Sequence, residues 1–340
     1  MNPYRLVVLL SLLAALITGC GASLPAGCPE DCIGESMFGR DLEHVNLSGA
    51  QLMDANLGKT NMVEANLSGA NLSGANLAEA NLESAIFDQA TLVGSDLSFA
   101  ILRNASMDQA DLRGANLRGA SLVRVDLTSA TMHGVTLNRS ELVGSVLSGL
   151  NMSGVQFYEA DLSGAELNET NLSGAALSLA EFNGAELQNA NLSGSWLNLT
   201  SLVGADLSGA NLSGSTLFGA DLTGANLSGV KLNGANLVGA NLSGADLRGA
   251  DLTGVVLLLP LPADAGPDFS YDNLSGEELT QALLAHPDLA KIVFDPVIPE
   301  LNETSLKPHL TDAVLQGVRY DEKTIWPLGF EIPSSAILLP

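Results

Sequence analysis

The sequence predicts an elongated solenoid, and the evidence for it lies in residues 42–257. Leu, Met or Phe occupies every fifth position from Leu42 to Leu257, 44 positions in all, without an insertion or a deletion. The residue two places before each is small, usually Ala; the residue one place before is usually Asn or Asp; the residue two places after is usually Gly. A period of five fits neither a helix nor a strand, so the repeating unit is a larger element that stacks on copies of itself.

These biases combine in units such as Ala65-Asn66-Leu67-Ser68-Gly69 and Ala240-Asn241-Leu242-Ser243-Gly244. In this the chain resembles the pentapeptide repeat family over roughly two thirds of its length. The resemblance implies a mainly β fold, a right-handed, quadrilateral parallel β-helix in which each pentapeptide forms one face and four form a coil. Residues twenty apart would then stack, and at a strand spacing of ~4.8 Å the 11 coils would rise about 53 Å.

The chemistry of the repeat agrees with that architecture. A coil with five residues to a side has a narrow interior, which one large apolar and one small side chain per face would fill. The other three positions then face outward, and Gly near each corner accepts turn geometry that a Cβ would strain. Leu150 occupies a position where Ala is usual, so we expect a locally widened coil there.

Residues 1–19 read as a lipoprotein signal peptide. Arg5 precedes the apolar stretch from Leu6 to Ile17, which is too short to span a bilayer comfortably. The closing Ile17-Thr18-Gly19-Cys20 resembles a bacterial lipobox, which implies cleavage before Cys20 and its acylation with a lipid such as palmitate. The resemblance implies an extracytoplasmic protein anchored to a membrane, and Gly21 favours the outer membrane in a host with two membranes. An ordinary signal peptide with an unmodified cysteine is the alternative.

Residues 20–40 are expected to form a linker and an N-terminal cap, followed by the β-helix over 41–258. The cap holds Cys28 and Cys32, for which a disulfide is the expected state outside the cytoplasm. A metal site that also used His44 would need a fourth ligand, which the sequence does not supply. We expect the cysteine loop to cover the open first coil, whose unpaired strand edges would otherwise invite aggregation.

Residues 259–340 are expected to form a C-terminal linker and cap. A capping box at Ser275–Glu278 predicts a helix that ends near His286, before Pro287. The five-residue spacing of apolar side chains from Phe269 to Phe294 supports an alternative, degenerate repeats. Residues 320–330 resemble a Y-D-x-x-T-x-W-P-x-G-F segment that follows the repeats in this family, so Trp326 and Phe330 are expected to anchor a cap by packing.

Charge and motif content exclude several functions. With a net charge of −24 and only 14 Lys and Arg, the chain is a poor ligand for nucleic acid or for an anionic membrane surface. Its four histidines (His44, His133, His286 and His309) have no catalytic or metal-binding spacing, and the common catalytic and nucleotide-binding motifs do not occur. We therefore predict a protein without enzymatic activity, cofactor or resident metal.

Stacking at an interval of twenty predicts two acidic columns on adjoining faces. One contains Glu141, Asp161 and Glu181, and the other contains Glu166, Glu186 and Asp206. Carboxylates ~4.8 Å apart repel each other, so some are expected to have raised pKa values or to share a cation. A solvated acidic surface that only aids solubility is the alternative reading.

The same rule gathers large apolar side chains on the outside of one face: Tyr158, Leu179, Trp196, Leu199 and Phe218. An apolar cluster of this size on a surface indicates a contact. The sequence leaves two partners open, the C-terminal segment of the same chain and another protein.

Together these features predict a lipid-anchored scaffold of the cell envelope that binds a protein or another envelope component. The best-known members of the resembled family protect DNA gyrase by mimicking the shape and charge of DNA. The acidity and length of this chain fit that alternative, but only if the chain is cytosolic. The resemblance also allows a homodimer formed through terminal coils.

Overall fold

The computed structural model describes residues 24, 25, 28, 30–257, 313–316, 318–327 and 330–339. The predicted signal peptide with Cys20, the linker after Leu257 and the predicted helix at 275–286 lie outside these residues. The described residues contain no helix with the length and hydropathy that a membrane crossing requires.

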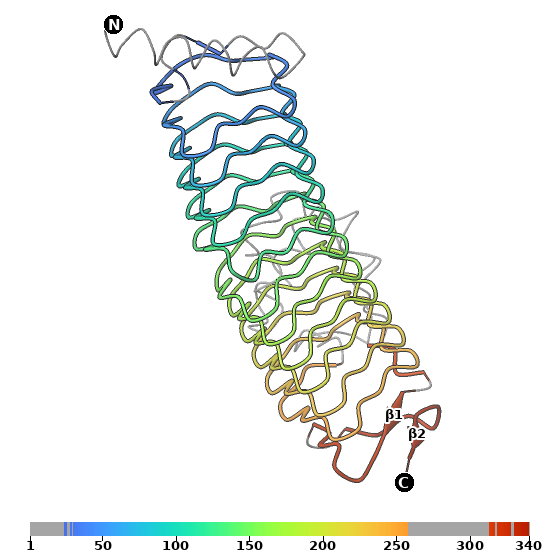
Figure 1. Ribbon diagram of the computed structural model, residues 1–340. Coiled ribbons are helices and arrows are strands. Elements are labelled where there is room, and N and C mark those ends of the chain that lie inside the picture. The colour runs from blue at the N-terminus through green and yellow to red at the C-terminus, as the bar shows by residue number, and fades with distance from the viewer. Residues whose placement is uncertain are drawn as a thin grey trace, which may run out of the picture.

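Residues 32–257 wind into a tower of stacked coils that runs from the N-terminal to the C-terminal end of the molecule (Figure 1). Outward residues pair in parallel with the residue twenty places ahead, from Ser36 with Asn56 to Asn236 with Val256. This register confirms the predicted stacking, because five residues on each of four faces make one coil of twenty.

We name the four faces by the units of one coil: face A is 180–184, face B 185–189, face C 190–194 and face D 195–199. Each name also covers the units that lie twenty residues apart above and below. Within a unit the five positions are, in order, small, first outward, central, second outward and corner.

The central and small positions line the buried interior of the tower, as the repeat predicts. Every central residue from Leu42 to Leu257 is at most 3% exposed, and every small position from Ala50 to Val255 at most 8%. Where a small position is Ser, its hydroxyl donates to the central carbonyl three residues earlier, as from Ser195 to Leu192 at 2.7 Å. The interior thus buries few polar atoms without a partner.

The backbone N–H groups of one unit show what holds the coils together. Three donate to adjacent coils and a fourth closes the corner turn: Leu192 to Asn211 (2.7 Å), Gly194 to Ser213 (2.9 Å), Asn191 to Thr170 (2.9 Å) and Ser195 to Leu192 (3.1 Å). The fifth, on Ser193, donates to the side-chain Oδ1 of Asn191 at 3.2 Å. Asn or Asp recurs at the first outward position because its side chain satisfies the one N–H that the ladder leaves free.

The corner residues explain the glycines. Each corner lies in the left-handed region, as at Gly194 (φ 65°), which is typical of the third residue of a type II turn. Between residues 30 and 257 only Ser129 departs from this geometry. Its hydroxyl instead accepts from the N–H of Gln109 (3.0 Å) and donates to Asp108 (2.8 Å), so a side chain replaces the usual carbonyl.

The ladder is interrupted at two places within residues 30–257. The bridges that would join Ser106 to Asp126 on face B and Thr131 to Asn151 on face C do not form. The second gap adjoins Leu150, whose large side chain occupies a small position below Ala130. The gap lies where the sequence predicts a widened coil.

Amide exchange should locate the second interruption. The N–H groups of Met132 and Asn151 make no inter-coil hydrogen bond, whereas that of Leu112 donates to Thr131 at 2.9 Å. We expect the Met132 and Asn151 amides to exchange at least ~10-fold faster than the Leu112 amide in hydrogen–deuterium exchange, because no ladder bond protects them. Equal protection of all three would show that the ladder is continuous.

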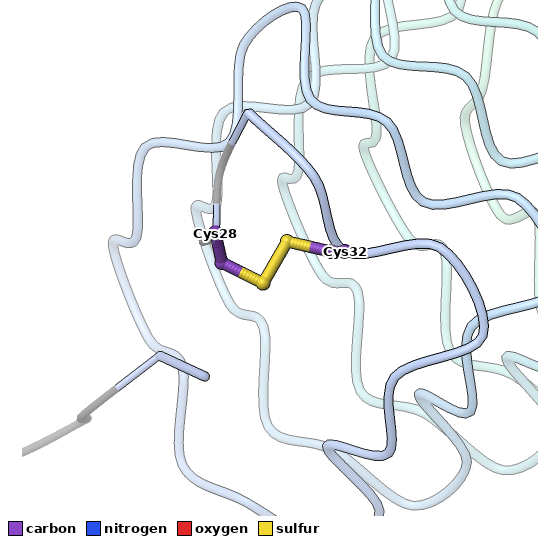
Figure 2. The surroundings of a disulfide bond; sticks show 2 residues. All are labelled: Cys28 and Cys32. Carbon is purple, nitrogen blue, oxygen red and sulfur yellow. A yellow bond between two sulfur atoms is a disulfide. The ribbon is translucent and has the colours of Figure 1, made fainter. Parts of the chain in front are cut away.

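The coils begin earlier than residue 41, the boundary expected from the Leu pattern. Cys32 and Met37 continue the spacing of five, are fully buried, and occupy central positions. Cys32 forms a disulfide with Cys28, with 5.1 Å between their Cα atoms (Figure 2), and Cys28 packs against the core. The disulfide therefore lies at the end of the apolar interior, where the first coil has no neighbour.

The tower also continues after the break that follows Leu257. Val314, Arg319 and Ile325 pair with Asn241, Asp246 and Asp251 on three successive faces. Strand β1 (Arg319–Tyr320) then pairs in parallel with β2 (Ile337–Leu338), which lies at the C-terminal end in Figure 1. Residues 313–327 thus add a partial coil that covers the last complete one.

Candidate binding faces

The structure brings the two acidic columns together as the sequence predicts. On face A, Glu141 pairs with Asp161 and Asp161 with Glu181; on face B, Glu166 pairs with Glu186 and Glu186 with Asp206. Four of the six side chains are exposed, whereas Asp161 and Asp206 are half-buried. The two columns lie on adjoining faces of the tower.

The expected rise in carboxylate pKa is wrong for Asp206. Burial alone would raise the pKa of Asp206, but hydrogen bonds from Ser208, Gln188 and Asn226 outweigh burial and lower it. The two amide side chains donate at 3.0 Å each, Gln188 to Oδ2 and Asn226 to Oδ1. Hydroxyl, amide and backbone donors beside the column therefore stabilise the Asp206 carboxylate.

A shared cation is not supported either. In the part of the chain that the structure describes, no group of three His, Cys, Asp or Glu side chains is arranged to hold a metal ion. Glu186 instead accepts from Asn168 at 3.1 Å, and Glu141 lies 3.5 Å from the Arg103 guanidinium. Asn168 and Gln188 both occupy the second outward position of face B, so the sequence already contained the signal that the pKa expectation overlooked.

All five residues of the predicted apolar cluster lie on outward or corner positions of face D. Tyr158, Leu179, Trp196 and Leu199 are half-buried, and Phe218 is fully buried. An outward residue that is fully buried must be covered from outside the tower. The cluster is thus already in contact with something and is not a bare surface patch.

The histidines within the described residues form no catalytic arrangement. His44 lies 3.2 Å from Glu64 and 3.4 Å from Glu43 on the surface of the tower, and His133 is exposed at a second outward position. His286 and His309 fall outside the described residues. Nothing in this part of the chain joins a nucleophile to a base in an enclosed site.

The C-terminal cap shows how the last complete coil is finished. The Asp321 carboxylate accepts the N–H of Gly249 at 2.8 Å, in place of the carbonyl that a further coil would supply. The Thr324 hydroxyl donates to the carbonyl of Leu247 at 2.8 Å. Trp326 stacks on Phe330 with ring centroids 5.5 Å apart, and both pack against the core, as expected for packing anchors.

Acid should loosen this cap. The N–H of Gly249 lowers the pKa of Asp321, and the Arg248 guanidinium lowers that of the buried Asp246, which also lies 3.6 Å from Arg319. Because both folded-state pKa values are depressed, their stabilisation is present above the ordinary carboxyl pKa of about 4 and is lost as the pH falls through the lower folded values.

Near-ultraviolet circular dichroism of Trp326, recorded in a Trp196→Phe background, should report this loss below about pH 4. Asp321→Asn keeps an acceptor for the Gly249 N–H but does not titrate. We therefore expect this variant to retain more of the signal in acid, with the remaining loss due to Asp246. An identical acid profile for both proteins would remove Asp321 from the account.

Two parts of the tower were not recognised in the sequence. Cys32 and Met37 replace the usual Leu at central positions of the first coil, so the Leu pattern begins only at Leu42. Ala313-Val314-Leu315-Gln316-Gly317 repeats the small, central and corner residues of a unit, but the long insertion before it hid the register. The spacing at the N-terminus and the Ala-x-Leu-x-Gly pattern at the C-terminus were the signals that could have found them.

Comparisons with known proteins agree with this architecture. A family model described as pentapeptide repeats matches the chain in 8 copies between residues 39 and 257. A search of curated proteins found no significant match.

Three solved structures illustrate the similarity. HetL, a pentapeptide repeat protein involved in heterocyst differentiation regulation in the cyanobacterium Nostoc sp. strain PCC 7120, is 31% identical over 71% of this chain and 94% of its own, with a TM-score of 0.32. Full-length QnrB1, a plasmid-mediated fluoroquinolone resistance protein, is 18% identical over 54% of this chain and 83% of its own (TM-score 0.26). Rfr23 from the cyanobacterium Cyanothece 51142 is 22% identical over 53% and 90% (TM-score 0.20). Because the family model spans most of the tower, the chain belongs to the pentapeptide repeat family and has its right-handed, quadrilateral β-helix.

Proposed function

We propose that this protein is a non-enzymatic scaffold of the bacterial envelope, held at a membrane by lipid on Cys20, that binds a protein or envelope component through its acidic faces. The observation that carries the proposal is the pair of aligned acidic columns on faces A and B. Each column places carboxylates at intervals of one coil along a backbone whose N–H groups are hydrogen-bonded. A rigid surface of this kind loses little conformational entropy on binding.

The proposed location rests on the sequence. Arg5, the apolar stretch from Leu6 to Ile17 and Cys20 have the order of a lipoprotein export signal. A single lipid chain binds a membrane only weakly, so stable anchoring requires the several acyl chains of a lipoprotein cysteine or a second contact. The acidic faces would be repelled by anionic lipid and would stay available for a partner with basic groups.

DNA mimicry is the second candidate, and the net charge of −24 favours it. An acidic tower can present charge at regular intervals to a topoisomerase such as gyrase, as the known mimics in the family do. The candidate requires a cytosolic protein, whereas the N-terminal sequence favours export.

Photocrosslinking in cells tests the scaffold proposal. A benzoylphenylalanine in place of Ser163, next to Asp161 on face A, should form an adduct with one envelope component. Glu166→Gln with Glu186→Gln should reduce the adduct, because the charge that attracts the partner is lost. Glu35→Gln with Glu83→Gln removes the same charge elsewhere on the tower and should leave the adduct intact.

Equal adduct yield in both double variants would contradict binding through the acidic columns. Formation of the adduct only in the cytosol, with a topoisomerase subunit, would favour the DNA mimic.

A further inference from the structure

Face D is covered over several coils, whereas most outward side chains of the other faces are exposed or half-buried. Six of its outward side chains are at most 4% exposed: Ser178, Asn198, Thr216, Phe218, Asn236 and Val238. On face A the matched second outward residues Val143 and Val203 are 36% and 39% exposed. Outside face D, the buried outward side chains of residues 30–257 are Ser121 (7%) and Asp246 (4%), and Asp246 pairs with Arg319 of the cap. The repeat therefore does not explain six covered positions on one face, and face D has an occupant.

The described residues beyond the tower do not account for this cover. Residues 313–327 pair with the last complete coil at Asn241, Asp246 and Asp251, and residues 337–338 pair with β1. The covered positions extend back to Ser178, about three coils from that end. The occupant therefore comes from elsewhere in the chain.

The path of the chain identifies the segment that covers face D. The tower is interrupted after Leu257, which is the central residue of face D in the last complete coil. It resumes at Ala313, whose N–H donates to the carbonyl of Leu257 at 2.8 Å. The same bond closes a regular corner, as from Ala240 to Leu237 at 3.0 Å. Residues 258–312 thus replace the two residues of one corner, and both ends of this insertion are fixed at the edge of face D.

The chemistry of face D also fits an apolar segment. Leu179 and Leu199 occupy corners where Gly is usual, at φ values of 61° and 57°, and both side chains are half-buried. Trp196 and Phe218 lie on the same face. Residues 258–312 contain 11 Leu residues and two each of Ile, Val and Phe. Within the tower, the side chains of Asn198 and Asn236 accept from the N–H groups of Phe218 and Val238.

We infer that face D between residues 175 and 239 is the docking site of residues 258–312 of the same chain. The contact satisfies the apolar cluster internally and leaves faces A, B and C for partners. It also fixes the insertion beside the corner at which the final coil resumes. The inference is independent of the lipid anchor and of the partner of the acidic columns.

Thiol labelling of two matched variants tests the cover. Ser178→Cys and Ser173→Cys change the same residue at the same position of adjoining units, but Ser178 is fully buried on face D and Ser173 is half-buried on face C. In the full chain, maleimide should modify the cysteine at 178 at least ~20-fold more slowly than that at 173, as measured by peptide mass spectrometry. Equal rates would overturn the inference.

Excision then tests the occupant. Replacing 258–312 with Ser-Gly, the order found in regular units such as Ser193-Gly194, restores a corner of regular length, and the cysteine at 178 should then react as fast as that at 173. If the cysteine at 178 stays protected in the folded excision variant, the inference is overturned. If its protection in the full chain is lost on dilution, the inference is also overturned, because a second copy of the chain then provides the cover. A benzoylphenylalanine in place of Leu179 provides an assay that does not require the excised chain to fold: its adduct should map within 258–312, and an adduct elsewhere would contradict the assignment.

Discussion

Replacing Leu187 with Asp should unfold the coils around it. Leu187 is fully buried at a central position of face B. A carboxylate there would have no partner in an apolar interior, which costs several kcal/mol beyond the ~2–3 kcal/mol lost with the Leu side chain. Because each coil contacts only its neighbours, the damage should divide the tower into two blocks that melt separately.

Thermal unfolding followed by far-ultraviolet circular dichroism, with limited proteolysis, measures this effect. We expect a broadened, lower transition and new cleavage close to residue 187. Asn189→Asp introduces the same charge two residues later at an exposed corner, and should change the free energy of unfolding by no more than ~0.5 kcal/mol. A cooperative transition near the wild-type midpoint for Leu187→Asp would contradict the packed interior.

Phe182→Ala should be the second most damaging single change. Phe182 occupies a central position and is 1% exposed, so truncation to Ala leaves a cavity and should cost about 3–5 kcal/mol. Phe182→Leu should cost less than ~1.5 kcal/mol, because Leu is the usual occupant of this position and the neighbouring coils are built around it.

Equilibrium unfolding in urea provides both numbers. If Leu costs as much as Ala at position 182, the interior of that coil is shaped around the Phe ring, and the central positions are not interchangeable as the repeat implies.

Most of the fold could be predicted because the repeat couples each residue to the one twenty places away. Once a period of five is assigned to four faces, the pairing of Glu141 with Asp161 and of Glu166 with Glu186 follows without further information. The same rule placed Leu199 and Phe218 on one face. Regular architectures of this kind are unusual in that sequence distance alone gives spatial distance.

The repeat period does not predict the surroundings of an outward side chain. The lowered pKa of Asp206 results from hydrogen bonds donated by Ser208, Gln188 and Asn226, and counting carboxylates along one column misses these donors. The cover over Phe218 results from chain topology after Leu257, where the repeat stops. The resumption of the repeat at Ala313 could not be predicted from the period either. The insertion before it breaks the five-residue register, and no local sequence pattern gives the length of the insertion.

Metabolic labelling with an alkyne-palmitate analogue tests the proposed envelope scaffold most directly. Wild-type protein and Cys20→Ser would be expressed in the same cells, separated into membrane and cytosol, and examined for lipid. The account predicts lipid on the wild type alone and wild-type protein in the membrane fraction. Unlabelled wild-type protein in the cytosol would contradict the anchor and make a DNA mimic the better explanation of the acidic tower.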